Sequence, residues 1–127
     1  MALTFVNREA ESNEFDAAAR SGGLLVVYGR RRVGKTRLLV EWLHRQSGWY
    51  SQAIEGPVGM QLHQIYRDLS LHIGTAIEPK SWSELLELLR LQKGRWVCCL
   101  DEFPYLVASD SSLPSLLQRW IDHDLPD

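Results

Sequence analysis

The chain has 127 residues, of which 45% are hydrophobic and 24% are charged, and its formal net charge is −2. This length is enough for one domain with its own core, so we expect residues 1–127 to form a single domain. The small net charge and a pI near 6.1 give no electrostatic reason to expect nucleic acid or an anionic membrane surface as a partner, and no apolar run is long enough to span a bilayer.

The first third of the chain alternates extended and helical patterns. Residues 3–6 read as a short extended segment, and residues from about 8 to 20 favour a helix that ends at Ser21-Gly22-Gly23. Residues 24–28 form a continuous apolar run, which is typical of a strand buried on both faces of a parallel sheet. Apolar residues then recur at helical spacing from position 35 to about 46.

The rest of the chain continues the alternation. Residues 49–54 predict a second buried strand, and residues 59–73 a weaker amphipathic helix. Ser81 and Glu84 have the spacing of a capping box that opens a helix to about residue 92. Residues 95–100 predict a third buried strand, and a last helix covers about 113–122. Strands that alternate with helices favour a three-layer α/β fold with a parallel sheet.

Cys98 and Cys99 are adjacent on the third predicted strand. Side chains of neighbouring strand residues point to opposite faces, so a disulfide between them is not expected and the spacing does not suit a metal. We expect both to be buried apolar residues of a cytoplasmic protein.

The most informative motif is the string Gly29-Arg30-Arg31-Arg32-Val33-Gly34-Lys35-Thr36, which reads G-x-x-x-x-G-K-T. It follows a predicted strand and opens a predicted helix, as the phosphate-binding loop of nucleoside-triphosphatases does. Backbone N–H groups of such a loop bind phosphate oxygens, its lysine reaches the β- and γ-phosphates, and its threonine hydroxyl binds Mg²⁺. With Arg37, the loop also holds the densest basic cluster of the chain, which a bound triphosphate would explain. The alternative is a glycine turn between strand and helix.

A second motif, Asp101-Glu102, follows the apolar residues 97–100. A strand of this kind delivers a carboxylate to the carboxyl edge of the sheet, where ligands bind in open α/β folds. Asp101 is then placed to hold Mg²⁺ opposite Thr36, and Glu102 to activate a water for attack on the γ-phosphate. A solvated strand end is the alternative. The sequence lacks an Asn-Lys-x-Asp string, which disfavours a GTPase, and it shows no lid or acceptor site of a small-molecule kinase.

At these residues the chain resembles the archaeal-type ATPase family of the AAA+ and signal-transduction ATPases. The strings that carry the resemblance are residues 5–9, residues 26–39 and Leu100-Asp101-Glu102-Phe103-Pro104-Tyr105-Leu106. The resemblance implies ATP rather than GTP, dependence on Mg²⁺, and a segment at residues 5–9 that lies near the adenine. That last implication falls on Val6, Asn7 and Arg8, which a plain strand and helix start would explain equally well.

Members of that family continue beyond the position of Asp127. The resemblance therefore implies that the chain corresponds to the N-terminal portion of an ATPase domain, without the sensor strand, the arginine that stabilises the γ-phosphate charge, or the helical lid. In ATPases with an additional strand, the sensor strand lies between the strand before the phosphate loop and the strand before Asp101. We expect this slot to be unfilled, with rearranged pairing, self-association, a protein partner that completes the sheet, or instability as the outcome.

Two functions remain open at this stage. One is an ATPase in which Lys35, Thr36, Asp101 and Glu102 act together. The other is a nucleotide-binding interaction or switch module with little or no turnover. The resemblance implies that nucleotide binding is weaker than in a whole domain and that hydrolysis is slow or absent.

Overall fold

The computed structural model describes residues 2–9, 12–29, 35–74 and 77–124. Its strands form one parallel sheet in the order β1-β2-β4-β3. The strands are β1 (Ala2–Asn7), β2 (Gly23–Tyr28), β3 (Trp49–Gln52) and β4 (Val97–Asp101). The expected α/β class with a parallel sheet is thus confirmed.

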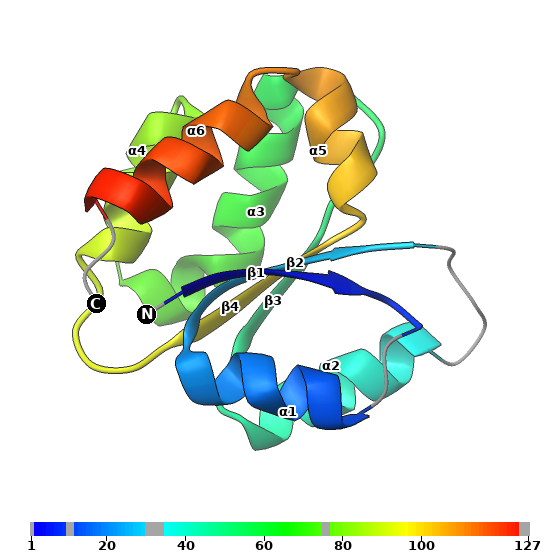
Figure 1. Cartoon of the computed structure of the whole chain (residues 1–127). Coiled ribbons are helices and arrows are strands. Elements are labelled where there is room, and N and C mark those ends of the chain that lie inside the picture. The colour runs from blue at the N-terminus through cyan, green and yellow to red at the C-terminus, as the bar shows by residue number, and fades with distance from the viewer. Residues whose placement is uncertain (1, 10–11, 30–34, 75–76, 125–127) are drawn as a thin grey trace.

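Helices cover both faces of this sheet, so the fold has three layers (Figure 1). On one face lie α1 (Ser12–Ser21) and α2 (Lys35–Arg45). On the other face lie α3 (Val58–Ile73), α4 (Trp82–Arg90), α5 (Phe103–Ser109), α6 (Leu113–Arg119) and the π-helical turn η1 (Trp120–Asp124). Within the described residues, no helix combines the length and the apolar character needed to cross a membrane.

The two central strands divide their side chains between two cores. Along β4, Cys98 and Leu100 pack with the helices α3 to α6, whereas Val97 and Cys99 pack with α1 and α2. The two cysteines are therefore buried on opposite faces, and both are free, as the sequence predicts. A strand with both faces covered must be apolar at every position, which explains the continuous apolar runs of β2 and β4.

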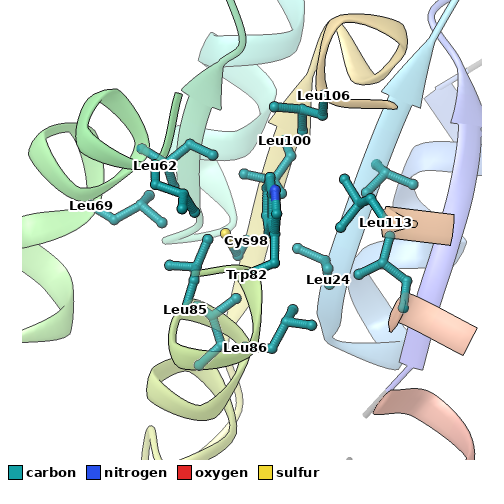
Figure 2. Close-up of a cluster of buried hydrophobic side chains, with 14 of the residues drawn as sticks. Leu24, Leu62, Leu69, Trp82, Leu85, Leu86, Cys98, Leu100, Leu106 and Leu113 are labelled. Carbon is teal, nitrogen blue, oxygen red and sulfur yellow. The ribbon is translucent and has the colours of Figure 1, made fainter. Parts of the chain in front are cut away.

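The larger core lies on the side of α3 to α6. Figure 2 shows leucines from α3, α4 and α6 gathered with Trp82 over Leu24, Cys98 and Leu100 of the sheet. Trp42, Trp82, Trp96 and Trp120 are all buried, and Trp49 is partly buried against the larger core. This core lies against the face of the sheet opposite α1 and α2.

Direct pairing of β2 with β4 contradicts the prediction of an unfilled slot between them. Gly23, Leu24, Leu25 and Val26 are in register with residues 97–100 of the neighbouring strand. Two apolar strands that would otherwise leave their backbone N–H and C=O groups unpaired in a core satisfy them by pairing with each other. β2 and β4 are therefore direct neighbours, and within the described residues the open edges of the sheet are those of β1 and β3.

Several boundaries differ from the sequence predictions. The first helix begins at Ser12 rather than near Arg8, because β1 runs to Asn7 and joins the sheet. The last helix ends at Arg119 and continues as the π-helical turn. The short helix α5 was not predicted, although Pro104 in its first turn is a common mark of a helix start.

The capping box before α4 is present. The Ser81 Oγ accepts a hydrogen bond from the Glu84 N–H at 3.2 Å. The Glu84 carboxylate accepts one from the backbone N–H of Lys80 rather than from that of Ser81. The helix start is thus fixed as the sequence predicts, with the acidic side chain reaching one residue further back.

Candidate functional site at the carboxyl edge of the sheet

The carboxyl ends of β1, β2 and β4 meet at one edge of the sheet because all strands are parallel. Asn7 is in register with Tyr28, and the N–H of Arg8 donates to the carbonyl oxygen of Tyr28 at 2.6 Å. Residue 8 is therefore fixed beside the end of β2, where the glycine-rich loop begins. The Asp101 carboxylate lies at the end of β4 on the same edge.

Asp101 is completely buried, with an exposed fraction of 0%. Its Oδ1 accepts hydrogen bonds from the Nη2 of Arg8 and from the N–H of Glu102 at 2.8 Å. Its Oδ2 accepts one from the Tyr50 hydroxyl at 2.6 Å. Burial of a carboxylate is costly unless it is paired and hydrogen-bonded, and here both oxygens have donors. The alternative interpretation of Asp101 as part of a solvated strand end is therefore wrong.

Arg8 is the centre of the site. Its exposed fraction is 2%, and its Nη2 also donates to the Glu102 carboxylate at 2.9 Å. Its Nη1 donates to the Thr36 hydroxyl at 3.3 Å. One guanidinium thus contacts oxygens of Asp101, Glu102 and Thr36, which follow it by 93, 94 and 28 positions. Its Nε is buried without a hydrogen-bond partner among the described atoms.

Tyr50 closes the site from β3. It is in register with Cys99, so its side chain shares the face on which Asp101 also lies. Burial, together with the hydrogen bond that it donates to Asp101, raises the pKa of Tyr50 above its ordinary range. The phenol therefore stays protonated and remains a donor to the carboxylate.

Glu102 has a strained backbone. Its φ of 61° lies in the left-handed region, which is uncommon for a residue with a side chain. This conformation ends β4 and starts α5, and it allows the Glu102 N–H to reach Asp101 Oδ1 while its carboxylate reaches Arg8. Strain of this kind persists where the surrounding structure fixes it, and it occurs often at functional sites.

Gly29 allows the first strand to approach the start of the loop. Its φ is 108°, and a Cβ at this position would lie 2.7 Å from the Oδ1 of Asn7. A side chain would push Asn7 and then Arg8 away from the edge. Glycine is therefore required here by backbone conformation and by space.

The structure brings together some of the predicted site residues and not others. Arg8, Thr36, Asp101 and Glu102 meet, and Gly29 lies beside them at the end of β2. Arg30, Arg31, Arg32, Val33 and Gly34 lie outside the described residues, and so does the side chain of Lys35, which opens α2.

The structure gives the contacts of three further predicted residues. The Val6 side chain is buried in the core on the α1 and α2 face. Asn7 accepts a hydrogen bond from the Glu9 N–H at 2.9 Å. Arg37 is exposed and pairs with Glu41 one turn along α2. The sequence reasoning missed Tyr50, for which strand alternation is the only available signal, and it did not predict that Arg8 contacts the acidic pair.

A comparison with known proteins shows a similar protein. The chain is 28% identical over 120 residues to the uncharacterized protein MJECL04 of Methanocaldococcus jannaschii. This alignment covers 94% of the chain but only 24% of that protein, so the chain spans about a quarter of its length. No model of a known protein family and no solved structure matches the chain.

Proposed function

We propose that the chain is a P-loop nucleotide-binding domain that binds ATP with Mg²⁺, as its resemblance to archaeal-type ATPases implies. The observation that carries this proposal is that the Arg8 guanidinium donates hydrogen bonds to both Thr36 and Asp101. Thr36 and Asp101 belong to different motifs of the sequence, and this shared contact brings the two motifs together. The strand before the glycine-rich loop and the strand before the acidic pair are parallel, so the two motifs follow carboxyl ends at the same edge of the sheet.

The residues present fit a magnesium ion held together with a nucleotide. Mg²⁺ prefers oxygen ligands and is bound in such sites by one or two carboxylates and by phosphate oxygens. Asp101 offers a carboxylate and Thr36 a hydroxyl, and both already accept hydrogen bonds from the positive guanidinium of Arg8. When bound, Mg²⁺ would neutralise the charge of the β- and γ-phosphates.

The roles of the remaining residues follow from their places. Gly29 begins the loop whose backbone, over residues 29–34, would bind the phosphates, with Lys35 adding a positive charge to them. Glu102 lies beside Asp101 and would orient a water for attack on the γ-phosphate. Tyr50 holds the Asp101 carboxylate through a hydrogen bond and thereby positions it.

A second candidate is a nucleotide-binding module that switches a partner or itself and turns over little. The observation that favours it is the ion pair of Glu102 with Arg8, because the guanidinium occupies a carboxylate oxygen that an attacking water would need. Partners of such a module would include a protein or a second copy that pairs with β1 or β3, the open edges of the sheet.

Binding is tested by titrating ATP into the wild-type chain and the Lys35→Ala variant, with and without Mg²⁺. We expect wild-type binding to need Mg²⁺ and Lys35→Ala to weaken it by about tenfold or more, since a charged contact to phosphate is lost. Lys93→Ala is the matched control, because Lys93 is exposed and precedes β4 at the opposite edge of the sheet. Equal ATP affinity in wild type and Lys35→Ala would refute the proposal.

Turnover separates the two candidates. Steady phosphate release that Glu102→Gln abolishes would identify an ATPase. Saturable, Mg²⁺-dependent ATP binding without phosphate release would identify the module.

A further inference from the structure

We propose that Arg8 is a built-in competitor of the divalent cation: its guanidinium fills the cation position between Asp101, Glu102 and Thr36, and it must leave when Mg²⁺ binds. This inference rests on the proposed function, because it assigns these oxygens to a magnesium ion. It adds that the Arg8 guanidinium occupies the site until a divalent cation displaces it.

The contacts of Arg8 are those that a bound cation would make. Its guanidinium contacts the carboxylate of Asp101, the carboxylate of Glu102 and the hydroxyl of Thr36. Asp101 already accepts three hydrogen bonds, so its carboxylate has little room for a cation while Arg8 is bound. A magnesium ion at Asp101 and Thr36 would take the same lone pairs and would repel a guanidinium at contact distance.

Stability alone does not account for this arrangement. Burial of an ion pair is weak evidence for stabilisation, since the loss of water often offsets the attraction between the charges. Arg8 also leaves its Nε buried and without a partner among the described atoms, and such a donor is costly. A side chain that is only partly satisfied in this position is easier to displace than one whose donors are all used.

The charges predict what happens when Arg8 leaves. Among the described side chains, Arg8 is the one positive group that contacts the two carboxylates of Asp101 and Glu102. Without it, two carboxylates remain close together with Asp101 fully buried, which strongly favours a divalent cation. Mg²⁺ and Arg8 are thus alternative solutions to the same excess of negative charge.

The test measures thermal unfolding of the full chain without nucleotide, in EDTA and in increasing MgCl₂, with NaCl at equal ionic strength as the salt control. In EDTA, Arg8→Met should lower Tm by roughly 10 °C, since it strands a buried carboxylate. Saturating Mg²⁺ should then raise the Tm of Arg8→Met by about 5 °C or more and that of wild type by about 1 °C or less. Arg95→Met is the matched control, since Arg95 is exposed and lies just before β4.

Two more variants keep the test decisive. If Arg8→Met does not fold in EDTA, Arg8→Lys is used, because a lysine keeps one charge but cannot bridge the three partners. Its Tm should respond to Mg²⁺ at a concentration about tenfold lower than wild type requires. Asp101→Asn in the Arg8→Met background should abolish the response to Mg²⁺.

Equal responses of wild type and both Arg8 variants to Mg²⁺ would overturn the inference. If wild type nevertheless binds ATP only with Mg²⁺, the proposed function stands and the competition by Arg8 alone is refuted. If Lys35→Ala leaves ATP affinity unchanged while Arg8→Met still responds to Mg²⁺, the cation site stands and the nucleotide proposal is refuted.

Discussion

Two positions of the same strand show two ways to bury a residue. Cys98 and Asp101 both lie on β4, and both have an exposed fraction of 0%. Cys98 is surrounded by apolar side chains of the larger core. Asp101 is surrounded by donors, namely the Arg8 guanidinium, the Tyr50 hydroxyl and the N–H of Glu102.

The difference lies in how many segments each position depends on. An apolar side chain is stabilised by the total area it buries, and no single neighbour decides the outcome. The Asp101 carboxylate is stable only while specific partners from the end of β1, from β3 and from the start of α5 stay in place. The interior of β4 therefore serves the fold, whereas its carboxyl end joins distant segments in one polar network.

The largest effect is expected in the interior of the strand. Leu100→Ala should reduce the free energy of unfolding by about 3–4 kcal/mol, through lost burial and the cavity left in the core. Denaturant unfolding measures this as a lower midpoint with an unchanged slope. Leu71→Ala is the control, because Leu71 is 93% exposed on α3. If addition of Mg²⁺ restores the stability of Leu100→Ala, the interior of β4 and its carboxyl end do not act independently, and the comparison is refuted.

The next effect concerns the network. Asp101→Asn should reduce the free energy of unfolding by about 2–3 kcal/mol, because the buried Arg8 keeps only Glu102 as an ionic partner. A double-mutant cycle with Arg8→Met should give a coupling energy of about 1–3 kcal/mol, as expected for residues in direct contact. Glu55→Gln is the control, since Glu55 is exposed. Additive effects of the two substitutions would show that the pair does not act as a unit.

A smaller effect is expected at β3. Tyr50→Phe removes one of the donors to Asp101 and should reduce the free energy of unfolding by about 1–2 kcal/mol. The loss should shrink in the Asp101→Asn background, where the acceptor is no longer charged. An equal loss in both backgrounds would mean that Tyr50 acts through packing alone.

The same contrast explains how far the sequence could predict the structure. Apolar runs predicted the interior of β2 and β4, because a strand with both faces covered is apolar at every position. Alternation placed Cys98 and Cys99 on opposite faces, because side chains along a strand repeat every two residues. The two motifs placed Thr36 and Asp101 at one edge of the sheet, because each motif follows the carboxyl end of a predicted strand. Arg8 could not be assigned to the acidic pair, since its place depends on β1 joining the sheet beside β2. No local sequence pattern predicts that pairing. The direct pairing of β2 with β4 depended likewise on which strands compete for the same backbone partners.

The smallest effect returns to Cys98. Burial raises the pKa of the Cys98 thiol to about 12 and also raises the pKa of Cys99. In the unfolded chain a thiol ionises near pH 8.5, so above this pH the unfolded state binds fewer protons than the folded state. The free energy of unfolding should therefore fall as pH rises, by about 1 kcal/mol for each thiol between pH 8 and 9.5.

Cys98→Ala tests this directly, because it removes one of the two thiols. Its stability at pH 7 should be slightly lower than that of wild type, but its decline between pH 8 and 9.5 should be smaller by about 1 kcal/mol. Unfolding curves at matched ionic strength measure the decline, and an identical decline in both proteins would contradict the burial of Cys98 as the source. A decline confined to the thiols would show that the apolar interior, and not the charged end of the same strand, sets the alkaline limit of the fold.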